Sequence, residues 1–565
     1  MEKKIVYDLK SVKLPYLAGG LLHLFVTLVE SPLGGLLIPN LLKSAGINWL
    51  RKQVLDEEPT HQPIHFTNAP AHEESAMPKE EWPSTDRKLS ADIRGFHFAT
   101  VFDYANAYRE GKITPEVVAQ KLLAAIEASN SSTPPLRAVI AINREDVLKQ
   151  AYESTQRIIT GKPISIFDGV PVAVKDELDM TPYPTTVGTS FLGSLPAKED
   201  ATAVARMRAA GALLIGKTNM HEIGINVTGL NPHYGVTRNP YNTNHFTGGS
   251  SSGSGTAVAA GLVPVALGAD GGGSVRIPAS FCGVFGLKPT YGRVSEYGAA
   301  PLCWSLAHIG PLAASATDTA LAYAAIAGPD LRDPNSLHQP LPTLENWDQL
   351  NLRGIKLGIY KEWFNHADAE VVAACETMLK RFTDMGAEIR EITIPNLELN
   401  RVAHAVTILI EMAQAMSYTY EDHHREHGLD VRLNLVIGRA FSGQDYVLAQ
   451  RARTRIIRNF NKVFEEVDLI LTPTTGIAAP PIPKDALPNG NSDLSITTEI
   501  MRFVTAGNMT GLPAISYPVG YTTAGLPIGM QAMGRAWEEN LLLRLAINAE
   551  RALERKEPQV HYKIL

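Results

Sequence analysis

The sequence predicts an α/β fold in which a largely internal sheet is covered by helices. Two short runs, residues 170–174 and 263–267, are apolar at nearly every position, which is typical of strands buried on both faces. Segments with helical periodicity lie between such runs. Because sheet-like segments flank both ends of a helical middle, we expect one interleaved domain rather than a row of separate domains.

The predicted elements alternate along the chain. In the first half, helices are expected within residues 100–128, where Thr114 caps one of them, and at 144–159, 201–210 and 256–261, with strands at 139–142, 170–174, 213–216 and 263–267. In the second half, helices are expected at 317–327, 369–385, 402–420 and 445–467, with strands at 356–359, 388–394, 468–471 and 514–518. Residues 480–495 are rich in Pro, Asn and Gly and predict a loop or lid.

Two apolar segments precede this alternating region. Residues 14–29 follow several lysines, and Pro32 stands shortly after them. The second apolar segment is residues 33–42. The first is short for a membrane span, and no small-residue cleavage pattern of a signal peptide follows it. We therefore expect two short helices in an intracellular protein. They dock peripherally into one membrane leaflet, or pack on the rest of the chain or a second subunit.

These features divide the chain into three predicted parts. Residues 1–55 form the apolar N-terminal helical cap or membrane-docking segment. Residues 56–95 are rich in Pro, Glu, His, Ser and Thr and predict an extended polar linker. Residues 96–565 form the main α/β domain.

Composition excludes several classes of function. The net charge is −6 and no long basic run is present, so a nucleic-acid partner is not expected. Three scattered cysteines fit neither a disulfide framework nor a Cys zinc site, and predict buried free thiols in a reducing compartment. No glycine-rich stretch ends in GK[ST], which weakens a nucleotide-binding interpretation, and neither cofactor nor metal is expected.

Two glycine- and serine-rich stretches, GGSSSGSG at 248–255 and GADGGGSVRIPAS at 268–280, indicate a hydrolytic site. Ser274 is the predicted nucleophile. It follows Gly271, Gly272 and Gly273, whose backbone N–H groups, with that of Ser274, would form an oxyanion hole. The alternatives are a phosphate-binding nest or a plain tight turn.

Lys175 is the predicted base, because none of the 16 histidines is paired with Ser274 by sequence alone. A free lysine has a pKa of about 10.4 and is protonated at neutral pH. Burial in the apolar run PVAVKD (171–176) would favour its neutral form. The alternative is a strand lysine paired with Asp176 or another carboxylate.

These stretches, together with DLILTPTT (468–475) and NMTGLPAISYPVGYTTAGLPIGMQ (508–531), resemble the amidase signature family from about residue 104 to the C-terminus. The resemblance implies a mixed central sheet with helices on both faces. It also implies a catalytic set in which Ser274 attacks, Ser250 bridges from behind a cis peptide and Lys175 is the base. Ser251 and Arg276 would support the loops, and Asp270 would do the same or form a structural pair with Arg276. Ser252 and Ser254 are expected to be loop filler.

The flanking segments narrow the resemblance. Residues 17–38, 56–63, 472–490 and 497–504 are similar to the plant-type fatty acid amide hydrolases. That resemblance implies hydrolysis of N-acylethanolamines to a fatty acid and ethanolamine, an apolar acyl channel, peripheral membrane association and a homodimer. Thr228 aligns with a segment near the pocket, the alternative being ordinary loop structure.

Three other functions compete with this one. A hydrolase of small or aryl amides would share the catalytic set but need no apolar N-terminal cap. A glutaminase subunit for transfer-RNA amidation would need ammonia channelling and a partner, which this N-terminus does not suggest. A catalytically silent membrane-associated scaffold would not need Lys175, Ser250 and Ser274 together.

Overall fold

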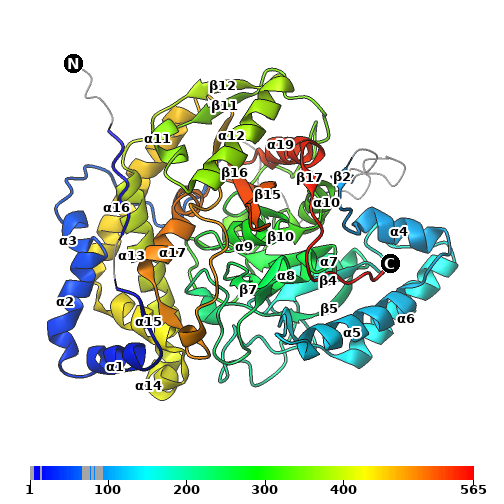
Figure 1. Cartoon of the computed structure of the whole chain (residues 1–565), viewed down its shortest axis with the longest axis horizontal. Helices are drawn as coiled ribbons and strands as arrows, with labels where there is room; N and C mark the ends of the chain where they lie inside the picture. The colour runs from blue at the N-terminus through cyan, green and yellow to red at the C-terminus, as the bar shows by residue number, and fades with distance from the viewer. Residues whose placement is uncertain (1–5, 13–14, 67–76, 78–81, 83–92) are drawn as a thin grey trace.

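The computed structural model describes residues 6–12, 15–66, 77, 82 and 93–565. Its centre is one 11-stranded sheet with the order β12-β11-β13-β16-β15-β9-β10-β8-β4-β5-β3 (Figure 1). The strands are β3 (Val139–Ala141), β4 (Pro171–Lys175), β5 (Leu213–Thr218), β8 (Val265–Ala269), β9 (Phe285–Lys288), β10 (Ile309–Ala313), β11 (Lys356–Ile359), β12 (Glu388–Glu391), β13 (Leu469–Pro473), β15 (Ala514–Tyr521) and β16 (Pro527–Gly534).

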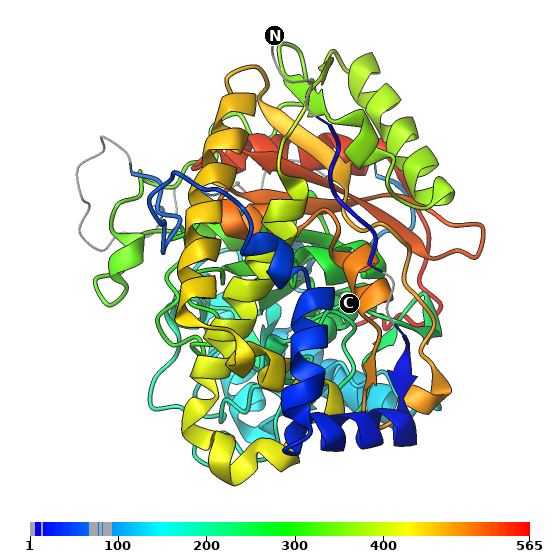
Figure 2. The same ribbon diagram turned by 90° about the vertical axis from the view of Figure 1, so that its left-hand side faces the viewer.

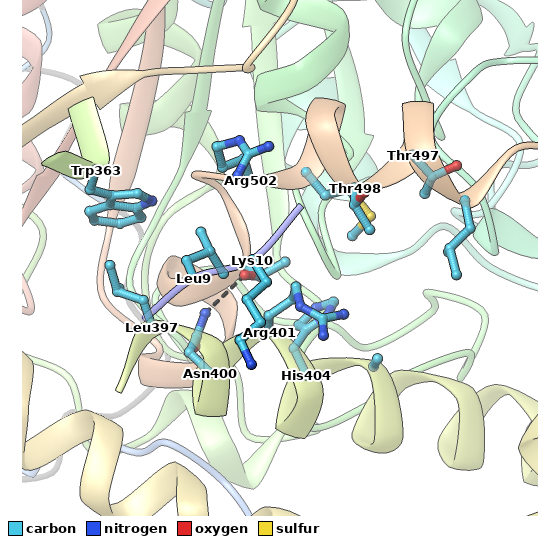
Figure 3. Close-up of a pocket in the computed structure, with 14 residues that line it drawn as sticks. Leu9, Lys10, Trp363, Leu397, Asn400, Arg401, His404, Thr497, Thr498 and Arg502 are labelled. Atoms are coloured by element: carbon cyan, nitrogen blue, oxygen red, sulfur yellow. Dashed lines mark hydrogen bonds between the residues drawn. The ribbon is translucent and has the colours of Figure 1, made fainter. Parts of the chain in front are cut away.

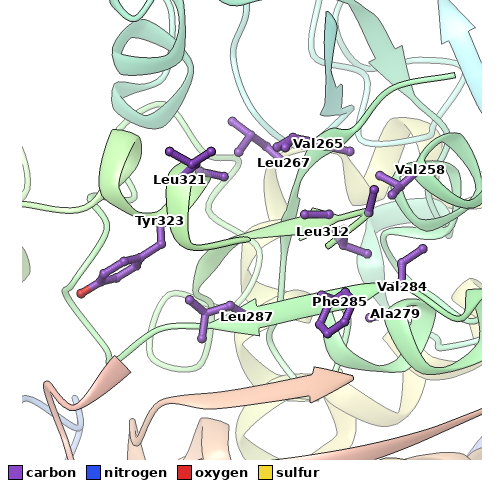
Figure 4. Close-up of a cluster of buried hydrophobic side chains, with 14 of the residues drawn as sticks. Val258, Val265, Leu267, Ala279, Val284, Phe285, Leu287, Leu312, Leu321 and Tyr323 are labelled. Atoms are coloured by element: carbon purple, nitrogen blue, oxygen red, sulfur yellow. The ribbon is translucent and has the colours of Figure 1, made fainter. Parts of the chain in front are cut away.

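Both parallel and antiparallel pairs occur in this sheet. β4 runs parallel to β5 and β8, and β11 runs parallel to β12 and β13, while the strands between these two groups pair antiparallel. The predicted α/β class is therefore correct, and the sheet is mixed. Every residue of β4 and β8 is buried. The apolar side chains around β8, β9 and β10 interlock in the main core, shown with Leu267, Phe285 and Leu312 in Figure 4.

Two groups of helices pack against the sheet. One contains α7 (Thr202–Ala209), α10 (Ala316–Ile326), α12 (Ala369–Asp384) and α19 (Glu539–Ala552). In the other, α8 (Ser252–Ala259) and α9 (Arg276–Cys282) contact the strands, while α13 (Leu397–Ala415), α16 (Gly443–Val463) and α18 (Thr505–Thr510) pack against one another. At one end, α4 (Val101–Arg109), α5 (Pro115–Ser131) and α6 (Arg144–Ile159) follow one another, and Thr114 caps α5 as predicted by accepting a hydrogen bond from Val117 N–H.

Several predicted elements need correction. The predicted helix at 402–420 is two helices, α13 and α14 (Ser417–His423), and α15 (Leu429–Ala440) was missed between them and α16. The predicted loop at 480–495 contains a 3-10 turn at Lys484–Ala486 and β14 (Asn491–Ser492), and α17 (Leu494–Met501) begins inside it. Strands β9, β10 and β16 were also missed. β9 contains Gly286, and β16 contains Gly529 and Gly534, and glycines weaken a strand pattern.

An N-terminal layer, which we define as residues 6–12 and 15–66, covers one side of the molecule. Here α1 (Gly19–Glu30) and α2 (Gly34–Ser44) are bent by 110°, and α3 (Ile47–Leu50) follows (Figure 2). α1 packs on α15, and Glu30 forms an ion pair with Arg432 there. Asp8 accepts the N–H groups of Leu397 and Glu398, the first two residues of α13. Most of the predicted linker, 67–76, 78–81 and 83–92, lies outside the described residues.

Candidate active site

Lys175 lies at the end of β4, in the interior of the sheet. It is fully buried, as are the residues before it in the strand. Its Nζ lies 2.8 Å from Ser250 Oγ, 3.2 Å from the carbonyl oxygen of Ala269 and 2.6 Å from Oε2 of Glu177. The structure therefore brings together the predicted base and the predicted bridging serine.

Ser250 stands immediately before α8, and the Gly249–Ser250 peptide is cis. Its carbonyl oxygen accepts the N–H of His221 at 3.1 Å. Ser251 connects the two loops, because its N–H donates to the carbonyl oxygen of Ser274 at 3.2 Å while its hydroxyl bonds to the backbone of Ala269. These contacts hold the loop of Ser250 directly against the loop of Ser274.

Ser274 is buried, with 5% of its surface exposed, in the loop between β8 and α9. Gly273 has a φ of +108°, a backbone conformation that glycine adopts without strain. The N–H of Gly273, which the sequence placed among the oxyanion donors, instead donates to Asp270 at 2.7 Å. Gly271, Gly272 and Ser274 thus remain the predicted donors at this loop.

A buried ion pair holds the loop in shape. Arg276 bonds both carboxylate oxygens of Asp270 at 3.0 Å and also reaches Gln531 and Asn508. Burial alone would raise the pKa of Asp270, but the Arg276 guanidinium and the Asn508 amide hold it well below its usual range. Asp270 is therefore a structural anion whose position fixes the N–H groups of Gly273 and Val275.

His404 on α13 touches the same loop, and sequence analysis missed it. Its Nε2 lies 2.9 Å from the carbonyl oxygen of Gly271, and burial lowers its pKa to about 4, so the ring is neutral at pH 7. A Cβ built on Gly272 would lie 2.8 Å from the His404 ring and 3.0 Å from Met501. No local signal distinguishes His404 from an ordinary core histidine of a long helix.

A cavity of about 100 Å³ opens beside this contact (Figure 3). α13, α17 and the N-terminal layer form its walls, and the lining includes Leu9, Trp363, Leu397, His404 and Met501. Gly272 lies against both His404 and Met501, so these two lining side chains stand between the cavity and the loop that carries Ser274. The cavity is largely apolar, with Asn400 bonded to Thr505 across one side.

The remaining predicted residues lie near the same loops. Thr228 is buried, and its hydroxyl lies 3.5 Å from Nδ1 of His221, whose other ring nitrogen bonds Asp430 on α15. Ser254 bonds the carbonyl oxygen of Leu267, and Ser252 bonds Thr237, so both hold α8 against its surroundings. The three cysteines, Cys282, Cys303 and Cys375, are buried free thiols, as the sequence predicts.

Comparison with known proteins places this arrangement in a family. The Amidase family model matches residues 119–543, which contain Lys175, Ser250 and Ser274. The chain belongs to the amidase family. It is 41% identical to the fatty acid amide hydrolase of Oryza sativa subsp. japonica, over 99% of this chain and 96% of that protein. It is 40% identical to the fatty acid amide hydrolase of Arabidopsis thaliana, over 99% and 97% of the two chains.

Solved amidase structures show how far the likeness of fold extends. The peptide amidase from Stenotrophomonas maltophilia aligns with a TM-score of 0.70 at 29% identity, covering 82% of this chain and 98% of that one. A bacterial aryl acylamidase aligns with a TM-score of 0.73 at 27% identity, covering 81% and 97%. These chains match only about four fifths of the present one, whereas the plant sequences match 99% and thus include the N-terminal layer.

Proposed function

We propose that this amidase hydrolyses fatty acid amides, with N-acylethanolamines as the substrate class and a fatty acid and ethanolamine as products. The observation that carries the proposal is the 2.8 Å contact between the fully buried Lys175 and Ser250, in a loop bonded to that of Ser274. The near full-length similarity to plant fatty acid amide hydrolases supports the choice of substrate.

In this mechanism Ser274 Oγ attacks the amide carbonyl carbon, and its proton passes to Ser250, whose own proton passes to Lys175. The negative charge that develops on the carbonyl oxygen is stabilised by backbone N–H groups of Gly271, Gly272 and Ser274. The chain of serine and lysine then returns a proton to the departing amine. Water hydrolyses the acyl-enzyme by the same route and releases the fatty acid.

The cavity beside His404 supports an acyl-binding role. Each CH₂ group moved from water into apolar surroundings contributes about 0.8 kcal/mol, so an apolar cavity of about 100 Å³ can hold part of an acyl chain with few polar contacts. Part of its wall comes from Leu9 and Lys10 in the N-terminal layer. Thr228, linked to Ser250 through His221, is the proposed polar contact on the substrate side.

We further propose peripheral, intracellular membrane association through α1 and α2. Leu21, Leu24, Leu33 and Leu36 are each more than half exposed there. Within the described chain no single helix is long and apolar enough to cross a membrane, and only the bent pair of α1 and α2 passes that test together. An apolar face of this kind suits insertion into one leaflet. The homodimer that the resemblance implies would use or flank the same face.

The first experiment is Ser274→Ala. We expect amide hydrolysis to fall by at least about a thousandfold while the melting temperature stays unchanged, because the hydroxyl is removed but the loop bonds are not. Normal turnover by this variant would exclude the mechanism.

The second experiment tests the substrate class. The kcat/KM values of N-acylethanolamines of several chain lengths are compared with that of a short aryl amide. An increase with chain length is expected from the apolar cavity. A preference for the short aryl amide would favour the alternative of a general small-amide hydrolase.

The same comparison can be made after deletion of residues 1–45. Loss of the chain-length dependence in that variant would assign part of the acyl contact to the N-terminal layer.

A further inference from the structure

Lys175 is surrounded by acceptors, and this creates a problem for a base. An ammonium group has three N–H donors and accepts no hydrogen bond. Ser250 Oγ, the carbonyl oxygen of Ala269 and the carboxylate of Glu177 each lie within 3.2 Å of its Nζ. Three acceptors match the three donors of a protonated lysine. A lysine in that form donates to Ser250 and cannot take its proton.

The carboxylate of Glu177 is the one acceptor that can also receive a proton. It lies 2.6 Å from Nζ, the shortest of the three contacts. Both side chains are buried, with 1% of Lys175 and 7% of Glu177 exposed. Two backbone hydrogen bonds fix the turn after β4 that presents Glu177. The carbonyl oxygen of Glu177 accepts the N–H of Ala300, and the N–H of Leu178 donates to the carbonyl oxygen of Lys175.

The groups that face this pair are mostly acidic. Burial raises the pKa of Glu296, Cys303 and Glu411. Glu296 and Cys303 each interact electrostatically with Glu177 and with Glu411, and Cys303 also interacts with Lys175. Repulsion from neighbouring carboxylates, Glu177 among them, adds to the increase for Glu296. The adjacent pair of Asp176 and Lys217 carries one charge of each sign. Lys217 is thus already paired with Asp176, and the partner of Glu177 is Lys175.

We propose that Glu177 is the positioning residue and proton partner that converts Lys175 into a base. The Nζ–H bond to Glu177 breaks, its electron pair stays on the nitrogen, and an O–H bond forms on Oε2. Rotation about the Cε–Nζ bond turns the amine lone pair from Glu177 to Ser250, and the lone pair accepts the proton of Ser250 as Ser250 takes that of Ser274. The inference deepens the proposed function, because it rests on Lys175 as the base of that mechanism.

Burial of the pair favours this transfer, because only 1% of Lys175 and 7% of Glu177 are exposed. The ion pair and the neutral pair hold the same number of protons, but the ion pair has two charges to solvate and the neutral pair has none. The base is thus generated within the pair, without exchange of a proton with solvent.

The pH profile distinguishes this role from a structural one. In the natural protein the active form differs from the resting form only in where one proton lies, so the rate is independent of pH while the pair holds one proton. In Glu177→Gln the lysine must lose its proton to solvent, so the rate rises about tenfold per pH unit while the ammonium predominates. At pH 7 we expect this variant to be slower by about a hundredfold or more.

The measurement is the rate of phosphonylation of Ser274 by a short alkyl fluorophosphonate between about pH 6 and 9, with kcat/KM for an amide recorded alongside. Glu177→Asp, which keeps a carboxylate, should retain a flat profile at a reduced rate. Glu411→Gln is the matched control. It removes a buried carboxylate from the same surroundings, but that carboxylate bonds Ser305 and Tyr446 rather than Lys175, so its profile should stay flat.

The outcomes separate this inference from the proposed function. Parallel profiles for Glu177→Gln and the natural protein, at whatever rate, would overturn the role of Glu177. Absence of labelling at Ser274 in the natural protein would overturn the catalytic set itself. Because the probe carries no long acyl chain, failure of the fatty acid amide assignment alone would leave the profiles of the variants unaffected. Equal melting temperatures show that each variant is folded.

Discussion

The loop around Ser274 and the N-terminal layer are stabilised in opposite ways. At the loop, the fully buried side chains of Asp270, Arg276 and Asn508 form hydrogen bonds with one another. Asp270 also accepts the N–H groups of Gly273 and Val275. In the layer, α1 and α2 bury only one side and leave leucines such as Leu24 and Leu36 exposed. The loop cannot change shape without leaving buried charges unpaired, whereas the layer leaves part of its apolar surface exposed.

The largest expected effect comes from breaking the polar bonds of the loop. Arg276→Met leaves the Asp270 carboxylate buried without its partner, and we expect the free energy of unfolding to fall by about 3–5 kcal/mol. Urea unfolding measures this loss of free energy. The control is Lys112→Met, which removes one partner of an exposed pair with Glu110 and should leave the free energy of unfolding nearly unchanged. Equal losses in the two variants would contradict the comparison.

The second effect concerns His404, which joins the loop to the cavity. Its folded pKa of about 4 lies below the unfolded value of about 6.5 because burial disfavours the charged ring. Unfolding therefore takes up a proton below pH 6.5, and the corresponding stability is lost as the pH falls from about 6.5 to about 4. Between pH 7 and 5 we expect this group to account for about 2 kcal/mol.

The variant His404→Gln isolates that contribution, because glutamine keeps an N–H donor for Gly271 but does not titrate. Unfolding free energies at pH 7 and 5 should differ by about 2 kcal/mol less in the variant than in the natural protein. An identical pH dependence of the two proteins would show that the ring is not held neutral against the loop.

The smallest effect is expected in the N-terminal layer. Leu36 is 75% exposed, so Leu36→Ser should leave the free energy of unfolding within about 0.5 kcal/mol. Binding to phospholipid vesicles should weaken about tenfold, because one leucine no longer enters the leaflet. Leu195→Ser, at a site of similar exposure in the loop before α7, is the control and should bind vesicles normally. Equal binding by all three proteins would leave a second subunit as the partner of this face.

The sequence predicted much of the fold because its signals are local. Apolar runs identified β4 and β8, and helical periodicity identified α5, α6 and α12. The errors arose where local signals conflict with packing. β10 contains a proline and a glycine, yet it pairs with β8 and β9 in the middle of the sheet because its neighbours bury it on both sides.

The candidate site also combines residues that local motifs indicate with contacts that only packing creates. Lys175 and Ser274 could be predicted as candidates from the apolar and glycine-rich motifs around them, and the resemblance to the amidase signature family added Ser250. Only the tertiary structure decided their partners: Glu177 against Lys175, Asn508 against Asp270, and His404 against Gly271. A buried polar group bonds whatever donor or acceptor packing brings within reach. For Asn508 and His404 that partner lies more than a hundred residues away in the chain, where periodicity and motif spacing carry no information about contact.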